Sequence, residues 1–85
     1  SAGDEKPEPE LPPEPEEGVL IYAALNPVTT YLKTNIKTYN KTHPETRIEI
    51  RDCSDDVGPE RLMTELMLGE VPAIMEMQER EIIYI

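Results

Sequence analysis

Apolar residues are concentrated in short stretches that are separated by longer, more polar segments. Residues 18–25 (GVLIYAAL) are apolar almost without interruption, which is typical of a strand buried on both faces. Residues 46–52 (TRIEIRD) alternate between apolar and charged side chains, which predicts a half-exposed strand at a sheet edge. Residues 72–77 (PAIMEM) predict a third strand, and the isoleucines of residues 81–85 indicate a fourth.

A helical pattern follows the first strand. Asn26 is a strong N-cap residue, and Pro27 suits the first helical position, where its missing N–H costs nothing. We therefore expect a helix that begins at Pro27 and ends near His43, because Pro44 disfavours a helical conformation at the preceding residue. The expected apolar face of this helix consists of Val28, Tyr31, Leu32, Ile36 and Tyr39.

A second helical pattern follows the alternating strand. Pro59 is suited to open this helix, and Gly69 to follow its last turn in a left-handed conformation. The apolar side chains between them recur at helical spacing, which predicts a buried stripe. Its members are Leu62, Met63, Leu66 and Met67.

The order of elements is therefore β-α-β-α-β, with residues 81–85 as an additional strand. Strands that alternate with helices predict a mainly parallel sheet with crossover connections. If the first strand is central because it is buried on both faces, the strand order is 2-1-3. We expect a small α/β unit of two or three layers in residues 19–85.

Residues 1–18 differ from the rest of the chain in composition. They contain five prolines, seven acidic residues and a single large apolar residue, Leu11. Such a segment cannot bury enough apolar surface to offset the entropy lost on ordering, and repeated prolines favour extended conformations. We expect a disordered, acidic tether in front of the domain.

Charge and composition exclude several classes of function. The formal net charge is −10, which disfavours nucleic acid or an anionic membrane surface as a partner. Cys53 is the single cysteine and His43 the single histidine, so we expect neither a disulfide nor a metal site. No glycine-rich cofactor motif, nucleophile–base pair or apolar run of about 18 residues is present. We expect no cofactor and no enzymatic activity.

Polar residues at the carboxyl ends of the predicted strands form the candidate site. In an open parallel sheet, ligands bind beyond these ends, near the point where the strand order reverses. Their amide, carboxylate and hydroxyl groups suit a neutral, hydroxyl-rich ligand. The six residues are Asn26, Asp52, Ser54, Asp55, Glu76 and Gln78.

Structural roles compete with ligand binding at several of these positions. Asn26 is also explained as a helix cap, and Asp55 as a cap or a solvated loop residue. Cys53 is either a thiolate near a helix N-terminus or a buried residue without chemistry. The residue types alone leave these alternatives open.

Four phrases in this order resemble the start of the extracellular solute-binding proteins of bacterial ABC importers, of the sugar-binding type. They are the first strand with its following helix, the helix end YNKTHP, the strand RIEIRD, and LMLGEVPAI. The resemblance covers roughly residues 19–77. Ala73 stands where the family usually carries Asp, and Cys53 where an aromatic residue is frequent.

The resemblance implies a protein of two α/β lobes that close around a sugar or oligosaccharide and deliver it to an ABC permease. It also implies an extracellular or cell-surface location, a removed signal segment, and a lipid-bearing cysteine ahead of Ser1 as the membrane anchor. Residues 19–85 would then be part of the N-terminal lobe. Since one lobe cannot enclose a ligand, weak affinity or none is expected.

A second hypothesis needs no small-molecule ligand. The domain is then a free-standing α/β interaction module that self-associates through exposed apolar edges. The isoleucine-rich residues 81–85 and the edges expected of a small parallel sheet motivate this alternative.

Overall fold

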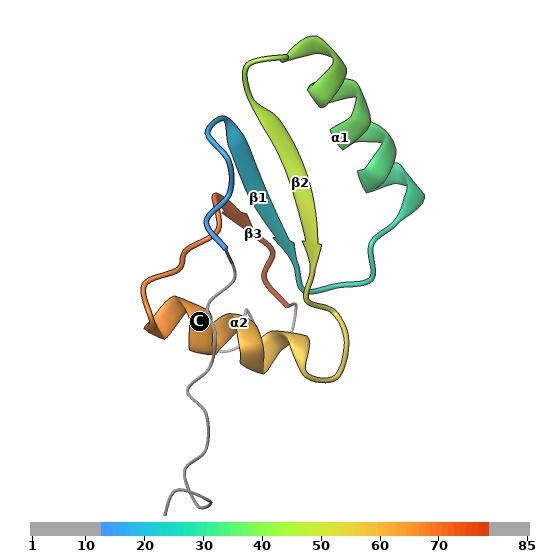
Figure 1. Cartoon of the computed structure of the whole chain (residues 1–85). Coiled ribbons are helices and arrows are strands. Elements are labelled where there is room, and N and C mark those ends of the chain that lie inside the picture. Colours follow the sequence, from blue (N-terminus) through green and yellow to red (C-terminus); the bar gives the residue numbers. More distant parts are fainter. Residues whose placement is uncertain (1–12, 79–85) are drawn as a thin grey trace, which may run out of the picture.

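The computed structural model describes residues 13–78, which form one three-stranded sheet and two helices (Figure 1). All strands are parallel and their order is β2-β1-β3, so the predicted α/β class and the order 2-1-3 are confirmed. The fourth strand expected in residues 81–85 lies outside the described residues, as do residues 1–12 of the expected tether. The elements are β1 (Val19–Ala24), α1 (Thr30–Thr42), β2 (Arg47–Asp52), α2 (Gly58–Met67) and β3 (Ile74–Met75).

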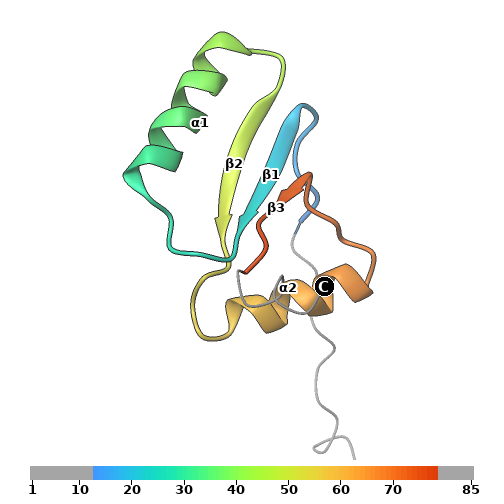
Figure 2. The ribbon, with the colours of Figure 1, turned by 180° about the vertical axis from the view of Figure 1, so that it is seen from behind.

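The central position of β1 is confirmed, but its burial is less complete than its apolar sequence predicts. Only Ala23 and Ala24, at its carboxyl end, are fully buried, and the four residues before them are half-buried. The reason is the placement of the helices. In both ribbon views α1 runs beside β2, and α2 lies beyond the carboxyl ends of β1 and β2 (Figures 1 and 2).

The start of α1 differs from the prediction. The helix begins at Thr30, and its N-cap is Thr29, whose Oγ1 accepts a hydrogen bond from the N–H of Leu32 at 3.1 Å. Asn26 and Pro27 lie in the preceding loop. The prediction of Asn26 as the cap was wrong. The polar groups of Asn26 contact Glu76, near the third strand, and Thr29, also a favoured cap residue, takes that role.

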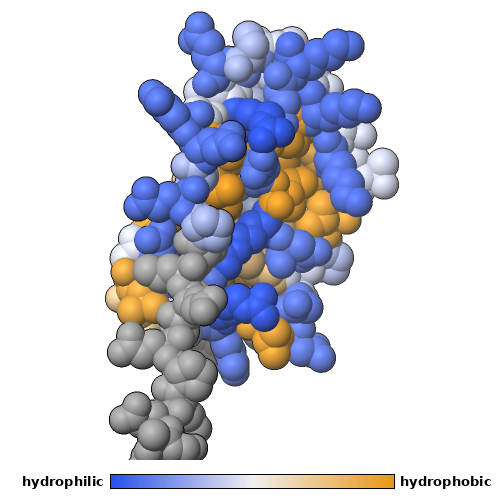
Figure 3. Space-filling view, in the orientation of Figure 1, coloured by the Kyte–Doolittle hydropathy of each residue, from blue (hydrophilic) through white to orange (hydrophobic). Residues whose placement is uncertain are grey.

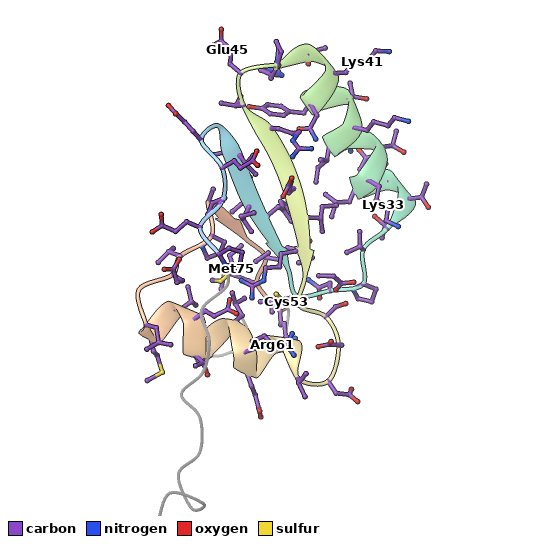
Figure 4. The ribbon with its side chains drawn as sticks, in the orientation of Figure 1. Lys33, Lys41, Glu45, Cys53, Arg61 and Met75 are labelled. Atoms are coloured by element: carbon purple, nitrogen blue, oxygen red, sulfur yellow. The ribbon has the colours of Figure 1, made fainter. Side chains whose placement is uncertain are left out.

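The apolar face of α1 packs against β2 only in part. Leu32, Ile36 and Tyr39 are half-buried, whereas Tyr31, predicted on the same face, is 79% exposed. The side chain of Asn40 forms hydrogen bonds with the backbone of the edge strand β2, as a neighbouring strand would. Its Nδ2 donates to the carbonyl of Ile48 at 2.9 Å, and its Oδ1 accepts from the N–H of Ile48 at 2.7 Å. The exposed side of the helix carries Lys33 and Lys41, which point away from the sheet (Figure 4).

Helix α2 begins and ends as predicted. Pro59 lies in its first turn, and Gly69 follows its last turn with φ +91°. The N–H of Glu70 donates to the carbonyl of Glu65 at 2.9 Å, and that of Gly69 to the carbonyl of Leu66 at 3.1 Å. These two bonds form a Schellman motif, which satisfies carbonyl groups at the helix end.

Of the four apolar residues predicted to be buried on α2, only Leu62 is fully buried. Leu62 is buried against Ala23 and Cys53, with Leu25 and Leu66 packed around them. Met63 and Met67 were predicted in the core, but they are 59% and 81% exposed. The inward face of α2 is instead formed by Gly58, Leu62 and Glu65, so the helix is rotated relative to the expected orientation.

The buried face of α2 includes a charged residue in addition to Leu62. Glu65 is only 4% exposed, and its Oε1 accepts a hydrogen bond from the guanidinium of Arg51. Among the described residues its Oε2 has no hydrogen-bond partner. This ion pair links α2 to β2.

The left-handed conformation of Gly69 can be tested by substitution. We expect Gly69→Ala to destabilise the fold by about 1 kcal/mol, because a Cβ is disfavoured at positive φ. No atom lies within 4 Å of the added Cβ, so the cost comes from the backbone alone. Urea unfolding followed by circular dichroism measures it. Gly69→Asn should cost less, since Asn tolerates this conformation better; equal losses for both variants would contradict the explanation.

The ion pair between Arg51 and Glu65 predicts that replacing Arg51 destabilises the fold more than replacing Glu65. Arg51→Met leaves a buried carboxylate unpaired and should cost about 3 kcal/mol of unfolding free energy. Glu65→Leu should cost less, because the Arg51 side chain is 31% exposed and can reach water. The double variant should recover most of the loss of Arg51→Met. Additive effects in urea unfolding would show that the two side chains are not coupled.

Candidate functional site

The best-defined polar cluster lies where β1 ends, and the carboxylate of Glu76 is at its centre. Oε2 of Glu76 accepts a hydrogen bond from the Tyr22 hydroxyl at 2.7 Å. Oε1 accepts three: from the N–H of Leu25 at 3.0 Å, from the N–H of Asn26 at 3.1 Å and from Nδ2 of Asn26 at 3.2 Å. We refer to Tyr22, Leu25, Asn26 and Glu76 as the Glu76 cluster.

The strands bring these groups together although they are about fifty residues apart in sequence. Tyr22 pairs with Ile74, and the N–H of Glu76 donates to the carbonyl of Ala23 at 3.1 Å. This last backbone bond holds Glu76 beside the end of β1. The side chain then reaches the two N–H groups exposed where β1 turns into the loop.

The hydrogen bonds shift the pKa values of both acids in the cluster. The hydrogen bond to Glu76, together with burial, raises the pKa of Tyr22 to about 12. Burial disfavours the charged form of Glu76, but the hydrogen bonds from Tyr22, Asn26 and Leu25 outweigh it and lower the pKa of this carboxyl. At neutral pH the cluster therefore holds a carboxylate and a protonated phenol.

The cluster retains limited capacity for a ligand. A carboxylate offers about four acceptor positions, and Oε1 already has three donors. One acceptor position on Oε2 and the Oδ1 of Asn26 have no partner among the described residues. The cluster can therefore accept hydrogen bonds from one or two hydroxyl groups, but it has few donors left to offer.

The last residue of β2 and the loop after it provide the next three of the predicted residues: Asp52, Ser54 and Asp55. Oδ1 of Asp52 accepts hydrogen bonds from both the N–H and the Oγ of Ser54, and these bonds lower the pKa of the Asp52 carboxyl. Asp55 is exposed, and its carbonyl, not its side chain, accepts the N–H of Gly58 at 3.3 Å. No side chain caps α2, so the expected capping role of Asp55 is not observed.

Two of the six predicted residues, Asn26 and Glu76, are joined by hydrogen bonds across the site. Gln78 follows two residues after Glu76 and is half-buried. Asp52 and Ser54 form a separate pair. The sheet topology thus brings the predicted segments to one end of the sheet, where Asn26 with Glu76 and Asp52 with Ser54 form two separate hydrogen-bonded groups.

A pocket lies elsewhere in the described part of the chain. It has a volume of about 240 Å³ and contains none of the six predicted residues. It is formed by the segment before β1, by β1 and β2, and by the loop between α2 and β3. Its lining residues include Pro13, Val19, Ile21, Arg51, Val71 and Pro72. Asn26 is exposed and Tyr22 and Glu76 are half-buried, so the Glu76 cluster is an open corner of the surface.

Cys53 is placed as a core residue. It is 4% exposed, between the end of the sheet and α2 (Figure 4), and burial raises the pKa of its thiol. A raised pKa lowers the fraction of reactive thiolate, which favours the structural alternative. Within residues 13–78 no group of three or more His, Cys, Asp or Glu side chains could hold a metal ion.

Two participants of the cluster were missed by the sequence-based prediction. Tyr22 and Leu25 were both assigned to the apolar run of the first strand, without a role in the site. The hydroxyl of Tyr22 within an otherwise apolar run was the available signal, because a buried phenol usually finds a hydrogen-bond partner.

Comparisons with models of protein families, with curated proteins and with solved structures found no match for this chain. Neither described helix is long and apolar enough to cross a membrane.

The pKa values of the cluster predict how stability depends on pH. The folded-state pKa of Tyr22, about 12, lies above the ordinary value of 10.0, so stability should fall as pH rises through this interval. Glu76 has a lowered pKa, so its contribution is present above the usual carboxyl range and is lost as pH falls through the folded value. Urea midpoints measured across pH test both slopes.

Matched tyrosine variants isolate the alkaline slope. Tyr22→Phe should flatten the loss of stability above pH 10.0, because the shifted phenol is removed. Tyr31→Phe, at a position that is 79% exposed, should leave the slope as in the wild type. If both variants keep the alkaline loss, the hydrogen bond from Tyr22 to Glu76 is not its origin.

Proposed function

We propose that this chain is a solute-binding module that recognises a sugar or oligosaccharide, and that it corresponds to part of the N-terminal lobe of an extracellular solute-binding protein of an ABC importer. The four sequence phrases that resemble this family motivate the assignment. A binding role, without catalysis, agrees with a cluster that holds a carboxylate, an amide and a phenol but no nucleophile–base pair.

The observation that carries the proposal is the position of the Glu76 cluster in the sheet. The order β2-β1-β3 places β2 and β3 on opposite sides of β1, so the strand order reverses at β1. The carboxyl end of such a strand is where open parallel sheets bind ligands. Tyr22, Asn26 and Glu76 meet at this end.

The cluster also limits the affinity to be expected. Its hydrogen-bonding groups largely satisfy one another, and the corner is open to solvent, so a bound sugar would remain mostly hydrated. Ligand sites usually bury most of the ligand surface. We therefore propose that residues 19–85 supply one wall of a site and that another lobe supplies the second.

The cellular setting of the proposal follows from the same resemblance. The chain would be lipid-anchored at the cell surface or extracellular, with residues 1–18 as the tether between membrane and domain. Its partner would be the ABC permease, which receives the ligand from the complete two-lobed protein.

A titration followed by amide NMR shifts tests the site. The 15N-labelled chain is titrated with monosaccharides and with oligosaccharides. We expect weak, saturable shifts at Leu25, Asn26 and Glu76, and smaller shifts at Asp52 and Ser54. An absence of shifts with all sugars, or shifts confined to other parts of the sheet, would contradict the proposal.

Matched asparagine variants distinguish recognition from general weakening of the fold. Asn26→Ala removes Nδ2 and Oδ1 from the corner and should weaken sugar binding several-fold. Asn35→Ala changes an exposed residue of the same type on α1 and should leave the affinity unchanged. Equal effects of the two substitutions would show that the corner does not contact the sugar.

A further inference from the structure

One face of β1 is only partly covered by helix α2. Ala23 pairs with Arg51, and side chains alternate along a strand, so Val19 and Ile21 lie on the same face as Arg51. The helix covers this face at the carboxyl end of β1, where Ala23 packs against Leu62 and is buried. Val19 and Ile21, nearer the amino end, are only half-buried.

Two further segments turn this face into the pocket of about 240 Å³. The segment before β1 contributes Pro13 and Pro15, and the loop between α2 and β3 contributes Val71 and Pro72. Both ribbon views show these segments on the side of β1 that faces away from α1 (Figures 1 and 2). The walls are therefore mostly apolar and come from four separate parts of the described chain.

The charges that β2 places on this face are already paired. Arg47 pairs with Glu49, and Arg51, which lines the pocket, pairs with the buried Glu65. Oε2 of Glu65 is also buried and has no partner among the described residues. An anionic ligand that approached Arg51 would thus come close to a carboxylate with an unused acceptor, and the two negative charges would repel each other.

The unpaired charges around the pocket are negative. Glu70 lines the pocket and is half-buried, and its carboxylate has no hydrogen bond or ion pair with any described residue. Residues 14–17 add three exposed glutamates to the segment that forms another wall. Arg61, the cation of α2, lies near Cys53 and does not line the pocket (Figure 4). The pocket therefore favours a positively charged ligand.

We propose that this pocket binds a small apolar molecule that carries one primary amino group. The apolar part lies against Val19, Ile21 and Val71, and the ammonium group pairs with Glu70. The volume of about 240 Å³ is below the roughly 300 Å³ at which pockets for drug-sized ligands begin, so the ligand has few non-hydrogen atoms. The proposal goes beyond sugar recognition and does not depend on it.

A small molecule fits this surface better than a protein partner does. A specific protein interface buries about 800 Å² on each partner, and its centre is apolar and depleted of charge. On the face seen in Figure 3, apolar surface occurs as separate patches between hydrophilic side chains. The pocket offers a concave apolar surface to a small ligand, whereas a protein would meet charged groups around it.

Ligands that share one carbon skeleton test the proposal. The 15N-labelled full chain is titrated with 3-methylbutylamine, 3-methylbutanol and 3-methylbutanoate, and with methylammonium as a cation that lacks the apolar part. We expect saturable amide shifts at Val19, Ile21 and Val71 with the amine, and several-fold weaker binding of the alcohol. The carboxylate should not bind, and methylammonium should give no saturable shifts at these three amides.

Matched glutamate variants test the role of Glu70. Glu70→Gln should weaken binding of the amine several-fold and leave binding of the alcohol unchanged; the effect is modest because a half-exposed ion pair contributes little. Glu60→Gln removes the same charge from an exposed position in the first turn of α2 and should leave both affinities unchanged.

Four outcomes would overturn the proposal. The first is an absence of saturable shifts with the amine, and the second is equal affinity for the amine and the alcohol. The third is binding of methylammonium at the same amides as tightly as the amine, which would mean general attraction of cations to an acidic chain. The fourth is equal weakening of amine binding by Glu60→Gln and Glu70→Gln.

Discussion

The carboxylate of Glu76 holds the third strand in place. Strand β3 has only two residues, and both are exposed, so neither its length nor its burial can stabilise it. Four hydrogen bonds from Tyr22, Leu25 and Asn26 to this one carboxylate compensate. Hydrogen bonds to a charged group are stronger than neutral ones, and here they join the two sheet segments most distant in sequence.

The rest of the fold follows the same principle of polar contacts replacing apolar burial. Asn40 binds the backbone of Ile48 and thereby links α1 to β2, while Arg51 and Glu65 link β2 to α2. Among residues 13–78, the buried apolar residues are Ala23, Ala24, Cys53 and Leu62. A domain of this size buries a modest fraction of its surface, so a few specific polar contacts are needed to fix the helices and the third strand against the rest of the sheet.

Sequence patterns predicted the architecture well and the helix orientations poorly. The apolar run of β1 indicated a central strand, and Pro59 and Gly69 correctly marked the ends of α2, because these signals act within a few residues. Met63 and Met67 were expected in the core, yet α2 turns Glu65 inward toward Arg51. Helical spacing shows which side chains share a face, but not which of two adjacent faces meets the sheet.

For the candidate site, sequence patterns were enough to identify the segments and the end of the sheet at which they meet. They did so through strand order, which follows from local apolar patterns. Two features became visible only in the folded chain: Asn26 contacts Glu76 and does not cap a helix, and Tyr22 belongs to the same cluster. These contacts span about fifty residues of sequence, and no local preference of the chain encodes them; they exist only once β3 has paired with β1.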